Sequence, residues 1–319
     1  MLKRKTIDIR ENLALPLDEC LAKTFGDKQG RKITEHCQIV GEVAKELIAR
    51  MPQWLRDDLF PQGSELIASA HDLGKVSPTF QEKIYRGTQG YQNNSKSELK
   101  NANPDIEKLW GGHAGVSQAT AAELKLGRYI PKILGQHHGY SPMLSNLAND
   151  AVFGGDSWQQ QRELLVIELK KRLNTNFPEV KNDTQARVLA GLTTVADWIG
   201  SSSRFDDPTN DWRPFIKQAL NEAGFVKPQL QPNLSFTQIF SFEPRYIQET
   251  LIENCKQAGV YVLEAPMGIG KTEAALYASY KLLTSGEATG IYFALPTQLT
   301  SDKIHERMNA FLESVLAPN

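Results

Sequence analysis

The chain has 319 residues, enough for about two domains, and its 40% hydrophobic and 23% charged content is typical of a globular protein. A formal net charge of -1 excludes a global basic field for nucleic acid, so such a site would have to be a local patch. The three cysteines have no C-x-x-C spacing, which argues against a disulfide framework and a thiolate zinc site. No apolar stretch approaches the ~20 residues of a membrane span, so a cytoplasmic protein without a membrane partner is expected.

The first predicted helix spans residues 34–50. Ile39, Val43 and Leu47 recur every four positions and define its apolar side. His36 lies near the start of the helix and faces the same side. A single histidine in such a place is more often a hydrogen-bonded core residue than a ligand, so it needs partners from elsewhere in the chain.

A second helix is predicted over residues 64–73, with Ser64 as its N-cap and Gly74 as its end. Its last turn carries the pair His71-Asp72, which supplies one imidazole nitrogen and one carboxylate. An imidazole holds a transition metal better than magnesium, and a carboxylate is able to bridge two cations. This pair is therefore the most specific feature of the first half of the chain.

The rest of the first domain is predicted to be helical. Residues 86–105 have too few apolar residues for a core element and are expected to form a loop. Further helices are predicted from near residue 112 and over residues 130–140, 157–175 and 184–201. Because no convincing alternating strand precedes residue 225, the fold class predicted for residues 1–225 is mainly α.

The pattern then changes. Residues 226–238 are rich in proline and glutamine and are predicted to be a linker. Residues 260–265 and 290–296 each predict a short apolar strand, with a helix between them. This βαβ order predicts a parallel sheet, and therefore an α/β fold for residues 239–319.

The run APMGIGKTEAAL follows the first of these strands and opens the helix, the context that a phosphate-binding loop requires. Gly268 and Gly270 allow backbone N–H groups to turn toward phosphates. Lys271 is predicted to reach the β- and γ-phosphates, and Thr272 to bind Mg²⁺.

Seven side chains from different predicted helices are candidate metal ligands, because donors must converge from several elements. They are His36, His71, Asp72, His113, His137, His138 and Asp197. With Asp72 as the bridging ligand, one cation is expected between His36, His71 and Asp197. The second is expected among the other three histidines, since the neighbours His137 and His138 share one site only near a helix end, which Gly139 provides.

Two cations at roughly 3.5–4 Å suit hydrolysis of a phosphodiester. Lys75, one turn after His71, is expected to meet a non-bridging phosphate oxygen. His305 is excluded from the site as a surface residue of a charged helix in the other domain. The candidates to line a DNA groove are Lys83, Arg86, Lys96 and Arg204, although charged loop residues are usually only solvated.

The order H…HD-x-G-K…H…HH…D resembles the HD superfamily of metal-dependent phosphohydrolases. More narrowly, the HH doublet and the run ADWIGSSSRFD look like the HD nuclease domain of the CRISPR-associated nuclease–helicase, and the resemblance covers nearly the whole chain. The phosphate-binding loop, with Ala265 where the usual motif has its first glycine, is similar to that of superfamily-two helicases. Gln248 resembles their adenine-reading glutamine, and Pro296-Thr297 resembles the next motif.

By this resemblance, residues 239–319 are the incomplete N-terminal part of a RecA-like helicase domain. No D-E-A-D or D-E-x-H carboxylate follows, although ATP hydrolysis needs one on the magnesium. Weak or non-productive binding of ATP with magnesium is therefore expected, and no ATPase or helicase activity from this chain alone.

The resemblance also implies a nuclease that cleaves single-stranded DNA in antiviral defence and is recruited by a Cascade-type guide-RNA surveillance complex. Asp72 and Lys75 would be its catalytic residues. Two divalent cations would be its cofactors, as manganese, nickel, cobalt, iron or magnesium, and the imidazole-rich site favours a transition metal. Two rivals stay open: an HD phosphohydrolase of small nucleotides, and a catalytically silent truncated module that only binds.

Overall fold

The computed structural model describes residues 13–91, 96–139, 150–257, 259–295 and 298–317. By its internal contacts the chain divides into two compact units, Met1–Val226 and Lys227–Asn319, each of which is described by itself. The division lies beside the predicted domain boundary at residue 225. None of the described helices combines the length and the apolar character that crossing a bilayer requires.

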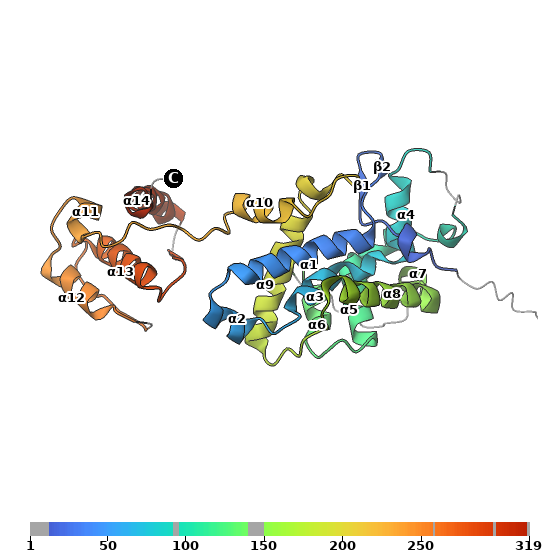
Figure 1. Cartoon of the computed structure of the whole chain (residues 1–319), viewed down its shortest axis with the longest axis horizontal. Helices are drawn as coiled ribbons and strands as arrows, with labels where there is room; N and C mark the ends of the chain where they lie inside the picture. Colours follow the sequence, from blue (N-terminus) through green and yellow to red (C-terminus); the bar gives the residue numbers. More distant parts are fainter. Residues whose placement is uncertain (1–12, 92–95, 140–149, 258, 296–297, 318–319) are drawn as a thin grey trace, which may run out of the picture. The chain divides into compact units, whose positions relative to one another are not determined.

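The first unit is built almost entirely of helices, so the predicted mainly α fold is confirmed (Figure 1). Its α-helices are α1 (Ile33–Arg50), α2 (Gln53–Leu59), α3 (Ser64–Ser69), α4 (Pro78–Arg86), α5 (Gly112–Glu123), α6 (Ile130–Gly135), α7 (Asp150–Phe153), α8 (Gly155–Leu173), α9 (Asp183–Gly200) and α10 (Phe215–Glu222). Its 3₁₀ helices are η1 (Leu17–Glu19), η2 (Ala70–Lys75), η3 (Ser97–Leu99), η4 (Pro104–Trp110) and η5 (Ser203–Phe205). The two-residue strands β1 (Thr24–Phe25) and β2 (Lys28–Gln29) form a small antiparallel hairpin that the sequence did not predict.

Helix α1 runs through the core of this unit (Figure 1). Its predicted apolar residues Ile39, Val43 and Leu47 are all buried, and the helix packs against α3, α8, α9 and α10. Burying a side chain of this size contributes about 1.5–3 kcal/mol. The same face carries His36 into the core, which explains why a polar ring is buried there.

The predicted helix over residues 64–73 is wrong in its second half. Helix α3 ends at Ser69, and the chain tightens into η2, where Asp72 has the non-helical dihedrals φ -100° and ψ 20°. Its N-cap is Gly63 in the left-handed region and not Ser64, whose hydroxyl donates to the carbonyl of Pro61. The predicted stop at Gly74 is also wrong, because this glycine is a residue of η2 itself.

Two other predicted boundaries differ from the structure. The predicted loop at residues 86–105 holds the short helix η3 with the buried Leu99, and η4 begins at Pro104, while residues 92–95 lie outside the described part. The predicted helix over residues 130–140 ends at Gly135, so the two histidines that follow lie in a turn.

The second unit contains the helices α11 (Phe236–Phe240), α12 (Tyr246–Asn254), α13 (Lys271–Ser285) and α14 (Gln298–Val315). Its small core includes Ile239, Leu276, Tyr280 and Phe311. The predicted linker at residues 226–238 takes part in this unit, because Leu230 forms an antiparallel bridge to Leu316 and α11 begins at Phe236.

The two predicted strands of the second unit are wrong. Residues 260–265 and the described part of residues 290–296 form no ladder, and Val260, Val262 and Tyr292 are 94%, 78% and 93% exposed. A parallel strand needs hydrogen-bonding neighbours and covered faces, and the described part of this unit offers no strand that pairs with either segment. Ile291 and Phe293 do pack against the small core of this unit, but no described strand pairs with their backbone. The RecA-like α/β fold therefore stays a prediction.

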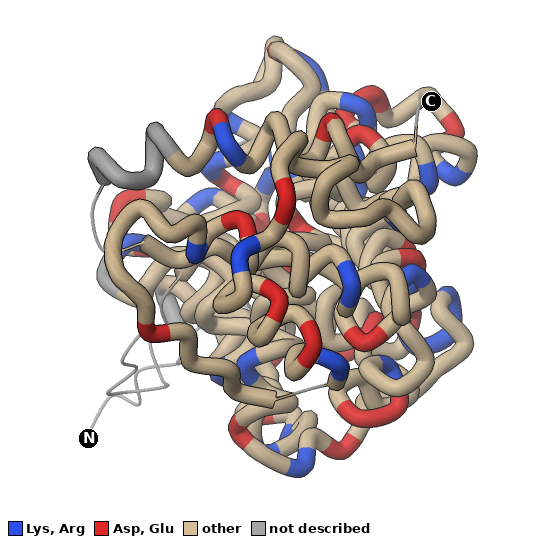
Figure 2. The backbone as a smooth tube through the Cα atoms, turned by 90° about the vertical axis from the view of Figure 1, so that its left-hand side faces the viewer, with Lys and Arg blue, Asp and Glu red and all other residues tan. Residues whose placement is uncertain are grey.

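The chain carries nearly equal numbers of basic and acidic residues, 36 Lys and Arg against 37 Asp and Glu. Figure 2 shows acidic and basic residues interspersed along the backbone, in keeping with the net charge of -1. Specific contacts, and not a field of one sign, must therefore bring any charged partner to a site.

Candidate metal centre

The seven predicted ligands lie in one neighbourhood of the first unit. They come from five places in the fold: His36 from α1, His71 and Asp72 from η2, His113 from α5, His137 and His138 from the turn after α6, and Asp197 from α9. The imidazole rings form an unbroken series of contacts, with centroids 4.1–5.6 Å apart from one ring to the next. Segments that are separated by up to 160 residues thus build a single cluster.

Asp72 lies at the centre of this cluster, and its side chain is 1% exposed. Its Oδ2 is 3.1 Å from Nε2 of His36 and 3.1 Å from Nε2 of His71. Its Oδ1 is 3.3 Å from Nε2 of His113 and 3.8 Å from Nε2 of His137. The two oxygens of one carboxylate therefore face two different sets of histidines, as a bridging ligand requires.

The donor atoms fall into two groups that could each hold a metal ion. One group contains His36, His71 and Asp72, and the other contains His113, His137 and His138, with donor atoms within 4.8 Å of one another in each. Asp197 joins the first group through His71, whose Nε2 is 3.2 Å from its Oδ1. The division follows the predicted one.

Hydrogen bonds fix the orientation of the inner histidines. Nδ1 of His71 donates to the carbonyl of Ala68 at 2.8 Å, and Nδ1 of His137 donates to the carbonyl of Leu134 at 2.6 Å. Each ring therefore turns Nε2 inward, in the manner of a metal-ligating histidine.

Two inward-facing atoms, Nε2 of His137 and Oδ1 of Asp72, are buried without a hydrogen-bond partner among the described residues, and Nε2 of His71 faces only the carboxylates of Asp72 and Asp197. Nε2 of His138 also lies 3.0 Å from Nε2 of His113, where two lone pairs would repel unless a proton or a cation lies between them. Buried polar atoms without partners are rare in folded proteins. This donor set fits divalent cations.

Burial and charge divide the protonation states of the histidines. Burial lowers the pKa of His36 to about 4, of His137 to about 4 and of His113 to about 3. Burial also opposes a charge on His71, but the carboxylates of Asp72 and Asp197 outweigh it and raise its pKa to about 10. In the absence of metal, His71 thus carries the proton that neutralises these carboxylates, whose own pKa values are lowered by His71 against the effect of burial.

Lys75, which the sequence predicts to meet a phosphate oxygen, lies against Asp72 in the structure. Its ammonium is 2.6 Å from Oδ2 of Asp72, and the side chain is largely buried. Burial opposes its charge, but Asp72 raises its pKa, so Lys75 stays protonated beside the cluster.

The backbone of η2 is pressed against α5. A Cβ on Gly74 would lie 1.9 Å from the carbonyl oxygen of His113, so only glycine fits there. The Gly74 N–H donates to Oγ of Ser117 at 2.8 Å. Gly74 therefore allows η2 and α5, which both carry candidate ligands, to approach each other closely. The hydrogen bond from Gly74 to Ser117 fixes their relative position.

Buried polar side chains also hold the end of η2. Gln81 donates to the carbonyl of Lys75 at 2.8 Å, and Arg162 donates to the carbonyl of Val76 at 2.9 Å. Sequence reasoning missed these residues and Ser117, since nothing local marks them. It also missed Ser201, whose hydroxyl donates to Oδ1 of Asp197 at 2.8 Å and whose place one helical turn after that aspartate was a usable signal.

The predicted phosphate-binding loop of the second unit opens a helix as expected, but the strand expected before it at residues 260–265 is absent. Gly268 and Gly270 have φ values of 77° and 88°, and α13 begins directly afterwards at Lys271. The loop borders a cavity of about 420 Å³. It is lined by Phe242, Arg245, Met267, Gly268, Ile269, Gly270, Lys271, Thr272, Glu273 and Arg307. Inside it the Lys271 ammonium donates to the carbonyl of Pro266 at 3.1 Å.

Gln248 does not line this cavity. The side chain is 1% exposed, donates to the carbonyl of Gly270 at 2.8 Å and accepts from the N–H of Arg245 at 2.8 Å. In the structure it therefore connects the start of α12 with the loop. The predicted motif at Pro296-Thr297 lies outside the described residues.

Comparisons with known proteins found related sequences and structures. Residues 22–205 match the family model described as "Cas3, HD domain". The chain is 28% identical over 307 residues to the CRISPR-associated nuclease/helicase Cas3 of Streptococcus thermophilus, which is 80% of this chain and 32% of the relative. It is 28% identical over 278 residues to the CRISPR-associated endonuclease/helicase Cas3 of Thermus thermophilus, which is 77% of this chain and 30% of the relative.

Solved structures show the same fold. A "CRISPR-associated protein" matches with a TM-score of 0.72 and 24% identity over 95% of this chain and 38% of its own. T. fusca Cas3 bound to ATP matches with a TM-score of 0.66 and 22% identity over 96% of this chain and 38% of its own. The chain thus spans about a third of the length of the relatives it matches.

Proposed function

This chain belongs to the Cas3 HD domain family, and from that membership we propose that its first unit is a metal-dependent nuclease of CRISPR defence that cleaves single-stranded DNA. The family model covers more than half of the chain and includes every candidate ligand from His36 to Asp197. The single observation that supports the proposal best is the position of Asp72, whose two oxygens face both groups of histidines.

The two donor groups would hold one cation each, with Asp72 between them and Asp197 beside the first. Two divalent cations in such a site supply a polarised water as nucleophile and charge stabilisation for the leaving oxygen. The protein itself holds the imidazole rings in the ligating orientation through Ala68 and Leu134. Lys75 orients Asp72 and adds a positive charge where the phosphate becomes more negative. The imidazole-rich donor set favours manganese, iron, cobalt or nickel over magnesium.

The remaining parts of the proposal concern partners. A solved "CRISPR RNA-guided surveillance complex, pre-nicking" matches with a TM-score of 0.57 and 24% identity, and we propose that a Cascade-type complex delivers the single strand. We also propose that the loop at Lys271 and Thr272 binds ATP with magnesium, with Gln248 supporting the loop.

The test is degradation of circular single-stranded DNA in the presence of manganese. Asp72→Ala should abolish cleavage and greatly reduce the manganese that the protein binds, because it removes an oxygen from each cation. His305→Ala, which changes an exposed histidine of the second unit, should keep both at the wild-type level. Full activity of Asp72→Ala would defeat the proposal.

The same assay separates the rivals. Hydrolysis of free nucleotides with no attack on long single strands would identify a small-nucleotide phosphohydrolase. A wild-type protein that binds no metal would identify a silent module, an outcome against which the buried Nε2 of His137 and Oδ1 of Asp72 argue, since neither has a hydrogen-bond partner among the described residues.

A further inference from the structure

We propose that Lys83 of α4 binds a backbone phosphate of the DNA strand beside the bond that is cut, an inference that rests on the proposed nuclease function. The sequence offered four cationic residues for a DNA groove: Lys83, Arg86, Lys96 and Arg204. The structure distinguishes between them by their partners and by their distance from the ligands.

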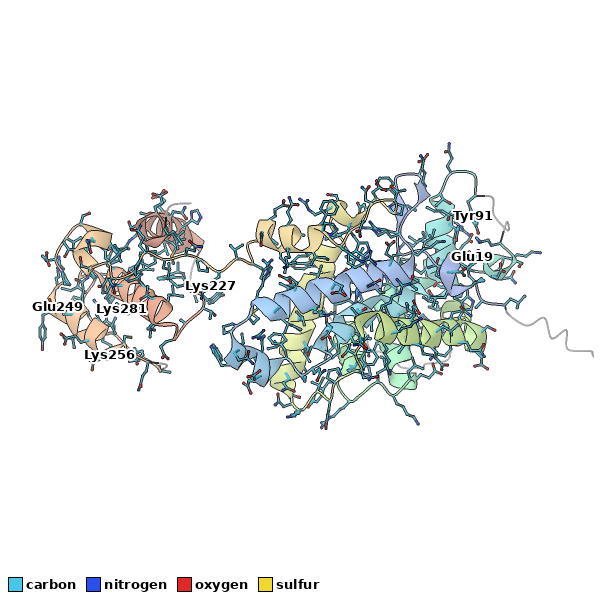
Figure 3. All side chains as sticks on the ribbon, viewed as in Figure 1. Glu19, Tyr91, Lys227, Glu249, Lys256 and Lys281 are labelled. Carbon is cyan, nitrogen blue, oxygen red and sulfur yellow. The ribbon has the colours of Figure 1, made fainter. Side chains whose placement is uncertain are left out.

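Three of the four are already neutralised by carboxylates. Arg86 lies 2.7 Å from Oε1 of Glu82. Lys96 pairs with Glu19, which Figure 3 labels, and Nη2 of Arg204 lies 2.5 Å from Oε2 of Glu222. Lys83 is exposed, and within the described part of the chain it forms no ion pair.

Lys83 also lies next to the metal ligands. Its ammonium is 5.8 Å from the centre of the Phe80 ring, and the ammonium of Lys75 is 5.5 Å from the same centre. The Phe80 ring packs edge-on against His113, with centroids 5.3 Å apart. One buried aromatic ring thus connects Lys83, Lys75 and a ligand of the second donor group.

The two lysines differ in what they can bind. Lys75 is buried and committed to Asp72, so it stabilises the site from inside. Lys83 is exposed, so a phosphate can reach its side chain. Burial raises the pKa of the Glu107 carboxyl, and the positive charge of Lys83 is the strongest influence that lowers it. The same carboxylate accepts a hydrogen bond from the backbone of His113. Lys83 therefore faces the corner between η4 and α5.

The exposure of the ligands shows from which side a strand arrives. His36, His71 and Asp72 are buried, whereas His138 is exposed and His113 is partly exposed. A polyanion therefore approaches the cluster past the second donor group, which is the side on which Phe80 places Lys83. At this position an ammonium contacts a phosphate adjacent to the scissile one without touching the cations.

The experiment compares Lys83→Gln with the wild-type chain, with Lys96→Gln as the matched control and Lys83→Arg as the conservative variant. Binding of an oligothymidylate is measured by fluorescence anisotropy at several salt concentrations, and cleavage is measured with manganese. Loss of one phosphate contact should reduce the slope of log affinity against log salt by about 0.7. KM for DNA should rise several-fold, while kcat and bound manganese stay unchanged.

Lys83→Arg should restore the slope, and Lys96→Gln should leave it unchanged. The proposal is overturned if Lys83→Gln matches the wild type in slope and KM, if Lys96→Gln gives the same loss, or if Lys83→Gln lowers bound manganese. A wild-type protein that neither binds nor cleaves single strands rejects the nuclease function itself, and Lys83 with it. A wild type that cleaves while Lys83→Gln behaves identically rejects Lys83 alone.

Discussion

When metal is absent, the positive charge of protonated His71 neutralises the carboxylates that a metal ion would otherwise neutralise. Two carboxylates, Asp72 and Asp197, lie 3.1 and 3.2 Å from its Nε2, and neither is well exposed to water. A positive charge between them offsets the cost of burying both. The neighbouring His36, His113 and His137 are neutral for the opposite reason, since burial dominates their surroundings.

Stability of the metal-free protein should therefore pass through a maximum near pH 6.5. His36, His113 and His137 have lowered pKa values in the folded state, so they take up protons on unfolding, and this favours the unfolded chain as the pH falls from 6.5 toward 4. His71 has a raised pKa, so its contribution is full below pH 6.5 and is lost as the pH rises toward 10. Melting temperatures measured in EDTA between pH 5 and 9 test both the loss of stability below pH 6.5, the acid limb, and the loss above it, the alkaline limb.

Asp197→Asn should flatten the alkaline limb, because it removes one of the two carboxylates that hold the proton on His71. The acid limb should remain. A melting temperature that rises steadily from pH 5 to 9 in the wild type would contradict the assignment of a charged His71.

At the scale of elements, the site depends on how η2 meets its neighbours. Gly74 allows the close approach to α5, and Ser117 fixes it with a hydrogen bond. Gln81 from α4 donates to the carbonyl of Lys75, and Arg162 from α8 donates to the carbonyl of Val76. Because His113 lies one turn before Ser117 on the same helix, this contact sets the distance from Asp72 to the second donor group.

Ser117→Ala should weaken metal binding by about 10–100-fold, as substitutions behind metal ligands do. It should also lower stability by about 1–3 kcal/mol, because it leaves the buried N–H of Gly74 without an acceptor. Titration calorimetry with manganese and denaturant unfolding measure the two effects.

Thr120→Val is the control, since Thr120 is buried on the same helix and its hydroxyl has no hydrogen-bond partner in the part of the chain that the structure describes. It should leave the metal affinity close to the wild-type value. Equal metal affinities of Ser117→Ala and Thr120→Val would show that this hydrogen bond does not position the ligands.

The long helices could be predicted because their signals are local. Helices α1, α8 and α9 begin and end within about two residues of prediction, and Asn182 caps α9 by accepting from Gln185. The bend at Asp72 could not be predicted from residues 64–73 alone, since the packing of η2 against α5 imposes it. The strands at residues 260–265 and 290–296 failed for a related reason: an apolar alternation predicts a strand only if other strands pair with it.

At the scale of the whole molecule, the chain consists of two units with separate cores and separate chemistry. The candidate metal ligands all come from the first unit, and the lining of the cavity at the predicted phosphate-binding loop all comes from the second. The ligands of one site and the lining of the other share no residue, so a substitution in one should leave the other intact.

Lys271→Ala should therefore abolish weak binding of a non-hydrolysable ATP analogue while the protein keeps its full manganese content. Lys281→Ala, which changes an exposed lysine of the same helix (Figure 3), is the matched control and should bind the analogue normally. Equilibrium dialysis and metal analysis measure both. Loss of manganese from Lys271→Ala would mean that the two sites are coupled.

The unequal cover over the two donor groups has a kinetic consequence. One group is closed on all sides by side chains, while the other has His138 at the surface. An ion at the outer position should exchange with the medium quickly, and an ion at the inner position should leave only when the fold loosens. A chelator is therefore expected to inactivate the protein in two phases, a rapid one that fresh metal reverses at once and a slow one that it reverses only over the time of local unfolding.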